Sequence, residues 1–194
     1  EQQRQSHESY FQDRSNKHLT FNIYPNFLTF LLFAFPTFSG GSGIGAMIAA
    51  GFCANGATVF FVSRKDTSPF CQELTNTYPG KAFSLRADLA KEKDVIQLSK
   101  ELQQQCPNGK LHCLVNNSGT NWAQPIDEYS LTGWNKVYDL NVRAVFHVTQ
   151  QLLPLLRASG TKSNPARVIN ISSIDSVMQP TLNTFAYSLS LIHI

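Results

Sequence analysis

The stretch Gly40–Gly41–Ser42–Gly43–Ile44–Gly45 decides the predicted fold, because this glycine-rich turn opens directly into a helical pattern. Glycines let the backbone approach a pyrophosphate closely, and the free N–H groups at the start of a helix attract its charge. Residues 44–53 form the predicted helix, and its large apolar side chains lie on one face: Ile44, Met47, Ile48 and Phe52. Glycine clusters are also ordinary turns, so the phosphate-binding interpretation depends on the pattern that follows.

Helices and strands alternate outward from this turn, as they do in a βαβ protein. Residues 57–62 (ATVFFV) and 111–115 are apolar throughout, which is typical of strands covered on both faces of a parallel sheet. Further strands are predicted at 81–86 and 166–171, and helices at 70–77, 91–106, 132–157 and 184–190. The pattern predicts an α/β fold with a doubly wound parallel sheet, that is, a Rossmann fold.

The bulk properties narrow the class of protein. The chain has 194 residues, enough for one domain, with 42% hydrophobic and 15% charged residues. Its net charge of +3 is mild and its basic residues are scattered among acids, so no nucleic-acid partner is expected. The four cysteines form no CxxC pair and no histidine lies at metal-ligand spacing, so we expect no metal and a cytoplasmic protein with reduced thiols.

The N-terminal region differs in composition from the rest of the chain. Residues 1–18 are polar and lack periodicity, which is typical of a disordered arm. Residues 27–35 form an apolar run that is too short to span a bilayer, so no membrane partner is expected. A signal peptide is the alternative interpretation, although no small-residue cleavage site follows the run cleanly.

The strand at 57–62 ends in Ser63–Arg64–Lys65. A site for NAD usually carries an acidic residue here, which binds the ribose hydroxyls. A hydroxyl and two cations instead suit a 2′-phosphate, because arginine can bind a phosphate through two parallel hydrogen bonds. The sequence therefore predicts NADP as the cofactor, with a solvated basic turn as the alternative.

Three other motifs lie at the ends of predicted strands or on the long helix. Asp88–Leu89 follows the strand at 81–86, and Asn116–Asn117–Ser118–Gly119 follows the strand at 111–115. In a doubly wound sheet the cofactor lies at the carboxyl ends of the strands, although either motif alone is also an ordinary turn. Asn141, Ser173 and Tyr187 are candidate catalytic residues, because a Tyr near a Ser can donate a proton to a developing alkoxide. Their alternative is an ordinary place in turns and core.

In this order, these motifs resemble those of the short-chain dehydrogenase/reductase family over residues 39–188. The branch that they most resemble contains the 3-oxoacyl-carrier-protein reductases of rhamnolipid type. Gly43 and Gly45 match the last two glycines of the family motif TGxxxGxG, and Ser118 replaces the Ala of NNAG. The resemblance implies that Asp88 contacts the adenine, Asn141 supports a proton-relay water, Ser173 polarises the carbonyl, and Tyr187 acts as acid and base. The implied cofactor-binding residues are Gly40, Gly41, Ser42, Gly43, Ile44, Gly45, Ser63, Arg64, Lys65, Asp88, Leu89, Asn116, Asn117, Ser118 and Gly119.

The sequence departs from the family pattern at both ends. Phe38 and Ser39 stand where the motif has Thr and Gly, and Pro36 lies where the first central strand is expected. Leu191 stands where the family has a Lys that promotes proton transfer from the Tyr and holds the nicotinamide ribose. We therefore expect a non-matching segment at 1–38, a cofactor-binding domain at 39–194 that is incomplete at its C-terminus, and ends that are not the family's native ends. A gene-model error or a genuine truncated variant would each produce them.

The resemblance implies an NADPH-dependent oxidoreductase that reduces a carbonyl compound, such as a 3-oxoacyl group or a similar ketone, to an alcohol. The partner is then a small-molecule carbonyl substrate, and a homo-oligomer formed through the helix at 132–157 is expected. Because Leu191 replaces the Lys, the alternative is a catalytically inactive nucleotide-binding or interaction protein. A chain whose sheet lacks an edge and does not fold stably is the third possibility.

Overall fold

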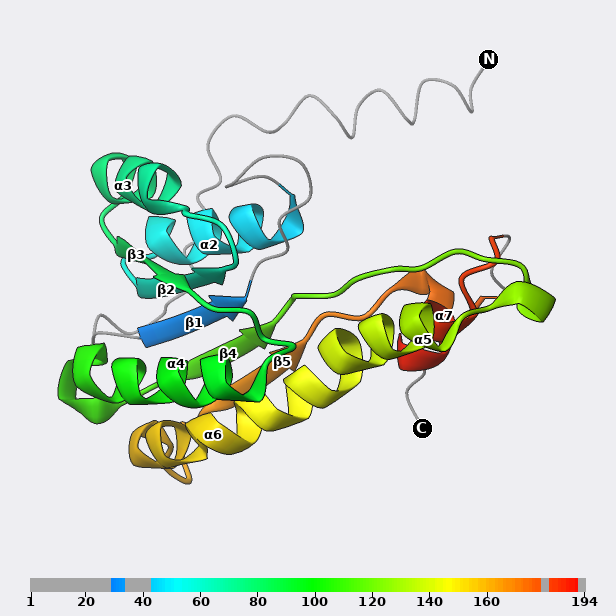
Figure 1. The fold of residues 1–194 in the computed structure, drawn as a ribbon. Helices are drawn as coiled ribbons and strands as arrows, with labels where there is room; N and C mark the ends of the chain where they lie inside the picture. Colours follow the sequence, from blue (N-terminus) through cyan, green and yellow to red (C-terminus); the bar gives the residue numbers. More distant parts are fainter. Residues whose placement is uncertain (1–28, 34–42, 179–181, 192–194) are drawn as a thin grey trace, which may run out of the picture.

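A parallel five-stranded sheet forms the centre of the molecule (Figure 1). The computed structural model describes residues 29–33, 43–178 and 182–191. The strand order is β3-β2-β1-β4-β5, and every neighbouring pair is parallel. The strands are β1 (Thr29–Phe33), β2 (Thr58–Ser63), β3 (Lys81–Arg86), β4 (Cys113–Asn116) and β5 (Arg167–Asn170). This order, in which the chain reverses direction across the sheet between β3 and β4, confirms the predicted doubly wound α/β fold.

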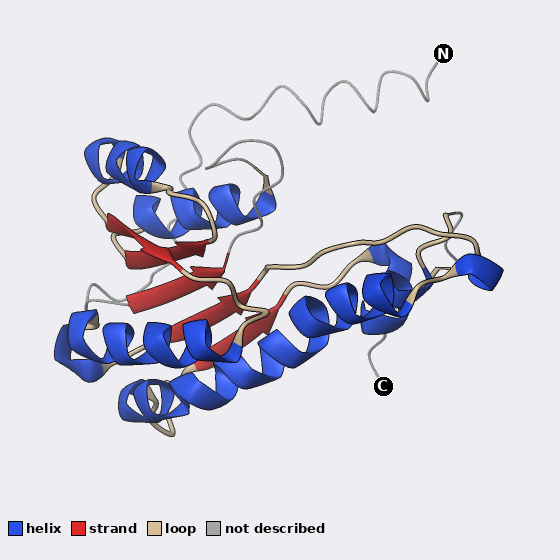
Figure 2. Ribbon diagram, viewed as in Figure 1, coloured by secondary structure: helices blue, strands red, loops and turns tan. Residues whose placement is uncertain are grey.

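Helices cover both faces of the sheet (Figure 2). On one face lie α2 (Ile44–Ala54) and α3 (Ser68–Thr77), and on the other lie α4 (Glu92–Gln105) and α6 (Ala144–Ser159). The helices α5 (Leu131–Tyr138) and α7 (Phe185–Leu191) extend beyond the carboxyl end of the sheet with η2 (Ile126–Glu128) and η4 (Ile174–Ser176). A short 3-10 turn, η1 (Pro107–Gly109), follows α4, and the π-helical turn η3 (Asp139–Arg143) joins α5 to α6.

The strand β2 shows why the sequence folds in three layers. Its side chains alternate between the faces, and nearly all are apolar and buried. Val59 and Phe61 pack with Cys53 of α2, whereas Phe60 and Val62 pack on the α4 and α6 side. Each such fully buried side chain contributes roughly 1.5–3 kcal/mol, so a continuous apolar strand requires cover on both faces.

The strand β1 lies in the middle of the sheet, between β2 and β4. It comes from the apolar run at 27–35 and ends at Phe33, so Pro36 follows the strand and leaves its hydrogen-bond ladder intact. The strand therefore precedes the predicted domain boundary at residue 39. Because the remainder of 1–38 lies outside the described residues, that boundary stays a prediction.

The helix α2 buries only part of the face that its large apolar residues define, because Ile48 and Phe52 pack against the core whereas Ile44 and Met47 do not. The buried residues are Gly45, Ala46, Ala49 and Cys53. In contrast, Ile44 is 61% exposed and Met47 is 73% exposed, so they do not face the sheet. Small residues let the helix lie close to the strands, and this close packing outweighs the amphipathic pattern of the larger side chains.

The predicted helix at 132–157 is formed in two parts. The helices α5 and α6 are joined by the π turn η3, and Pro154 lies inside α6. π turns are rare and often mark functional sites, and Asn141 is the central residue of this one. No helix in the described part of the chain is long and apolar enough to cross a membrane.

Candidate functional site

The predicted site residues gather at the carboxyl end of the sheet because all its strands run in one direction. The strand register places Ser63 beside Arg86, and Asn116 beside both Phe33 and Asn170. In an open α/β sheet, ligands bind in the crevice outside these strand ends. The start of α2 and the loops that follow β2, β3, β4 and β5 therefore lie along one rim of the sheet.

The first part of the rim is the start of α2. Gly43 has φ 86° and ψ −169°, a backbone conformation that is essentially restricted to glycine. It caps α2 without a side-chain hydrogen bond, and the first turn of the helix contains no acidic residue. The N–H groups at this end are thus available to an anion, beside the exposed Ile44 and the buried Gly45. Gly40, Gly41 and Ser42 lie outside the described residues.

The second part is the turn after β2. Ser63 is buried, and its Oγ accepts the Lys65 N–H at 3.2 Å, whereas Arg64 and Lys65 are exposed. The nearby Asp66 is engaged by Ser68, whose hydroxyl and N–H donate to Oδ1 at 2.6 and 2.9 Å. These hydrogen bonds hold the pKa of the Asp66 carboxyl below its ordinary value. The turn is therefore fixed locally, and both cations project into solvent.

The third part is the loop between β3 and α4. Asp88 is half-buried, forms an ion pair with Lys91 at 3.4 Å, and accepts the Ala90 N–H at 3.3 Å. Its own N–H donates to Asp94 Oδ2 at 3.1 Å, and Leu89 belongs to the core. The carboxylate thus takes part in a local turn, and the role of Asp88 toward adenine stays a prediction.

Asn116, at the end of β4, is a buried polar side chain with a structural role. Its Nδ2 donates to Asn170 Oδ1 at 2.8 Å and to Thr149 Oγ1 at 3.3 Å. It thereby connects β4 to β5 and to α6. Gly119 follows on the same loop, and a Cβ there would lie 3.4 Å from Asn141 Oδ1, an ordinary van der Waals contact. Asn117 and Ser118 are half-buried.

The side chain of Asn141 ties the π turn to the loop after β4 and to α7. Its Oδ1 accepts the Thr120 N–H at 2.7 Å. Its Nδ2 donates to the Thr120 carbonyl at 3.1 Å and to Ser190 Oγ at 3.0 Å. Both amide hydrogens are used inside the protein, so this side chain positions its neighbours.

The helix α7 carries Tyr187 and is held to the rest of the site by two serines. Ser190 Oγ donates to the Tyr187 carbonyl at 2.7 Å and accepts from Asn141. Ser172 Oγ donates to the Leu191 carbonyl at 3.3 Å, and Ser173 caps η4 by accepting the Asp175 N–H at 3.3 Å. The elements that carry the three predicted catalytic residues are thus joined at one end of the sheet.

Three further residues of this region were not singled out from the sequence. Thr120 and Ser190 bind Asn141, and Arg86 binds the backbone of Arg64. Ser190 lies three positions after Tyr187, so helical spacing places the two on neighbouring positions of α7. Thr120 and Arg86 depend on contacts between distant segments, which no local pattern in the sequence reveals.

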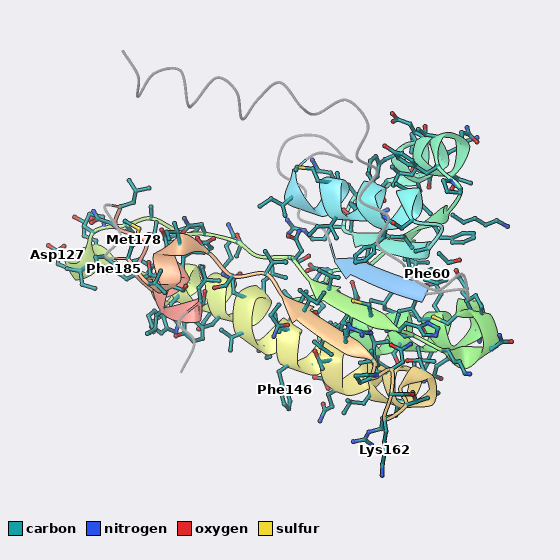
Figure 3. The ribbon with its side chains drawn as sticks, turned by 180° about the vertical axis from the view of Figure 1, so that it is seen from behind. Phe60, Asp127, Phe146, Lys162, Met178 and Phe185 are labelled. Atoms are coloured by element: carbon teal, nitrogen blue, oxygen red, sulfur yellow. The ribbon has the colours of Figure 1, made fainter. Side chains whose placement is uncertain are left out.

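A groove of about 520 Å³ is lined by residues of η3, α6, β5 and α7. Asn141 and Ser190 lie in its wall with apolar side chains such as Val145, Phe146 and Val168. Phe146 is 67% exposed and points away from α6 (Figure 3). The described residues contain no group of three or more His, Cys, Asp or Glu side chains that could hold a metal ion.

Comparison with known families agrees with this arrangement. The short chain dehydrogenase family model matches residues 38–190, which is most of the chain. The chain belongs to the short-chain dehydrogenase family. The match contains Gly43, Arg64, Asn141, Ser173 and Tyr187, so all these positions are in the part that defines membership.

Members of the family from bacteria and fungi are similar in sequence. The rhamnolipids biosynthesis 3-oxoacyl-[acyl-carrier-protein] reductase of Pseudomonas aeruginosa is 41% identical over 77% of this chain and 58% of that protein. The hydroxynaphthalene reductase-like protein Arp2 of Metarhizium guizhouense is 30% identical over 76% of this chain and 53% of that protein. The chain therefore spans a little over half the length of these relatives.

Solved structures of short-chain dehydrogenases share the fold. The RhlG/NADP active-site complex of Pseudomonas aeruginosa has a TM-score of 0.75 and 37% identity, over 84% of this chain and 61% of that one. L-sorbose reductase from Gluconobacter frateurii, solved with NADPH and L-sorbose, has a TM-score of 0.73 and 25% identity, over 84% and 59%.

Proposed function

We propose that this chain binds NADP(H) and that the protein to which it belongs reduces a carbonyl compound, such as a 3-oxoacyl group or similar ketone, to an alcohol. The observation that carries the proposal is the pair of exposed cations Arg64 and Lys65 at the carboxyl end of β2. The relatives solved with NADP and NADPH support the same cofactor.

The described residues fit such a cofactor. The uncapped N-terminus of α2, with Gly43 in a glycine-only conformation, suits a pyrophosphate. Guanidinium and ammonium groups at the end of β2 suit a 2′-phosphate, because arginine binds phosphate through two hydrogen bonds. A bound nicotinamide cofactor supplies hydride chemistry to such a site.

The chain's own residues would handle the oxygen and the proton. Ser173 would hold the substrate oxygen through its hydroxyl, and Tyr187 would donate the proton as the alkoxide develops. Asn141 and Ser190 would keep α7 in place through their hydrogen bonds, at 3.0 and 2.7 Å. Within this proposal Asn141 is a positioning residue, whereas Ser173 and Tyr187 touch the substrate.

A catalytically inactive nucleotide-binding or interaction protein is the second candidate, and Leu191 favours it. This residue ends α7 four positions after Tyr187, where the family has a Lys, and its side chain supplies no charge. The chain with Leu191 is therefore expected to bind NADPH and to turn over carbonyl compounds negligibly.

The test follows NADPH oxidation with a panel of 3-oxoacyl thioesters and diketones. A fusion to the C-terminal part of a relative, with Leu191→Lys, Phe38→Thr and Ser39→Gly, should gain turnover. The matched control is the same fusion with Leu191 retained, which should stay inactive. Robust turnover by the unmodified chain would contradict the role given to position 191, and no turnover by the Lys fusion would contradict the proposed reaction.

Self-association of the protein is proposed on the exposed apolar side chains of η3 and α6. Val142 is 40% exposed and Phe146 is 67% exposed. Both belong to the helical segment through which family members are expected to form oligomers. Sedimentation of the full chain should show a dimer or larger species that Phe146→Asp weakens, whereas a wholly monomeric chain would contradict the proposal.

A further inference from the structure

The carboxyl end of β3 reaches into the turn that carries the proposed phosphate-binding cations. Arg86, the last residue of β3, is paired in register with Ser63. Its Nε donates to the Arg64 carbonyl at 3.0 Å, and the Ala87 N–H donates to the Ser63 carbonyl at 3.1 Å. The position of the Arg64 backbone is therefore fixed from β3 as well as from β2.

Arg64 and Arg86 also share one surface pocket. They line an open pocket of about 440 Å³ that continues past Lys91 and the carboxylates of Asp88, Asp94 and Glu101. The ion pairs among the described residues are Lys91–Asp88 and Arg143–Asp139, so neither arginine has a carboxylate at ion-pair distance there. The charge of Arg86 acts on the Asp66 carboxylate, but that carboxylate accepts hydrogen bonds from Ser68.

The geometry of the Arg86 guanidinium leaves part of it available. A guanidinium has five N–H donors, and among the described residues only the Nε–H of Arg86 has a hydrogen-bond partner, the Arg64 carbonyl. Two guanidinium groups at one pocket favour an anion that contacts both of them. A phosphate dianion is such an anion, because each arginine can give it charge-assisted hydrogen bonds.

We propose that Arg86 is a specificity-determining residue that selects for a phosphate on the adenosine ribose, both by holding Arg64 and by adding a second guanidinium. This inference rests on the proposed binding of NADP(H) and assigns the discrimination to a residue of β3. Without Arg86 the site would rely on the exposed side chains of Arg64 and Lys65. With Arg86 the phosphate contacts a turn whose backbone is held in place and two guanidinium groups, each of which can donate two hydrogen bonds.

The experiment is a calorimetric titration of the full chain with adenosine 2′,5′-bisphosphate and, separately, with adenosine 5′-monophosphate. The first ligand carries the ribose phosphate and the second lacks it. Arg86→Gln should weaken binding of the bisphosphate about tenfold, the scale of one hydrogen bond to a charged group. Binding of the monophosphate should change less than about twofold, because it makes no contact with this cation.

Two further variants separate the charge of Arg86 from its hydrogen-bond geometry and from a general loss of positive charge. Arg86→Lys keeps the positive charge but removes the planar guanidinium that can donate two hydrogen bonds. Its affinity for the bisphosphate should therefore fall less than that of Arg86→Gln. Lys81→Gln removes one exposed positive charge from the opposite end of β3 and should leave both affinities unchanged. Circular dichroism of every variant checks that the fold is kept.

The outcomes separate this inference from the proposed function. If the unmodified chain prefers the bisphosphate and Arg86→Gln keeps the full preference, the role of Arg86 is overturned while the cofactor proposal stands. An equal loss for both ligands also overturns it, because Arg86 would then support the loop without selecting the phosphate. If the unmodified chain shows no preference, the cofactor proposal fails as well.

Discussion

The strands β2 and β5 belong to one parallel sheet, yet their surroundings differ greatly. β2 is buried along nearly its whole length, with Phe60 and Phe61 packed on opposite faces. All four residues of β5 are exposed, including Val168 at 44% and Ile169 at 40%. The proposed nucleotide side of the site thus lies on the core, whereas the proposed catalytic side is joined to the sheet by hydrogen bonds of Asn116, Asn141 and Ser190.

The difference in burial between β2 and β5 indicates which side of the site is more stable. Burial on both faces fixes β2 and the turn with Arg64, so cofactor recognition depends on well-packed structure. The catalytic side leaves Ile174, Val177, Met178 and Leu182 more than half exposed. We therefore expect nucleotide binding to be robust and the geometry around Tyr187 to be easily disturbed.

The largest effect is expected from a pair of neighbours in the sheet. Leu114 of β4 is fully buried and lies directly beside Val168 of β5. Leu114→Ala should lower the free energy of unfolding by about 2–5 kcal/mol, because it leaves a cavity in a packed core. Val168→Ala should cost less than about 1 kcal/mol, since its side chain is already partly in water. Urea denaturation measures both, and equal losses would contradict the comparison.

A smaller effect is expected at the turn that opens α2. Gly43→Ala forces a Cβ onto a glycine-only backbone conformation and should destabilise the protein by about 1–3 kcal/mol. Gly51→Ala, in the same helix, meets no atom within 4 Å and should stabilise it by about 0.5–1 kcal/mol. If the two changes have the same sign in urea denaturation, Gly43 lacks the assigned role.

At neutral pH the smallest effect on stability concerns the buried thiols of Cys53, Cys71, Cys106 and Cys113. Burial raises the pKa of each from 9.0 to about 11. Well below pH 9 the thiols are protonated in both states, so they leave stability unchanged. Between about pH 9 and 11 only the unfolded chain ionises, so the free energy of unfolding falls as the pH rises. At pH 8 a disulfide reagent should label the native chain far more slowly than the unfolded chain, and rapid native labelling would contradict this burial.

The sequence predicted those parts of the fold whose pattern is local. β3 was predicted with its observed bounds, and β2 to within one residue, because their apolar residues lie in short runs between turn residues. β1 was not assigned as a strand, since residues 34–42, including Pro36, separate it from Gly43. The apolar face of α2 was predicted only in part: Ile48 and Phe52 pack against the core, but close packing on the sheet buries small residues such as Ala49 and leaves Ile44 and Met47 exposed.

The candidate site shows the same division. The order of the motifs predicted that Asn141, Ser173 and Tyr187 belong to one site. Hydrogen bonds in the structure join α7 to η3 and to the segment that precedes Ser173. The π turn around Asn141 has no local signal in the sequence, because helical periodicity continues through it. The hydrogen bond from Arg86 to Arg64 spans 22 positions and arises only from the pairing of β2 with β3.

A calorimetric titration of the unmodified chain with NADPH and with NADH tests directly whether this domain selects the phosphorylated cofactor. Arg64 and Lys65 should make NADPH bind at least about tenfold more tightly, the scale expected of one hydrogen bond to a charged group. Arg64→Asp should reverse the preference, because a carboxylate repels the phosphate and accepts the ribose hydroxyls of NADH. Equal or tighter binding of NADH by the unmodified chain would contradict the account.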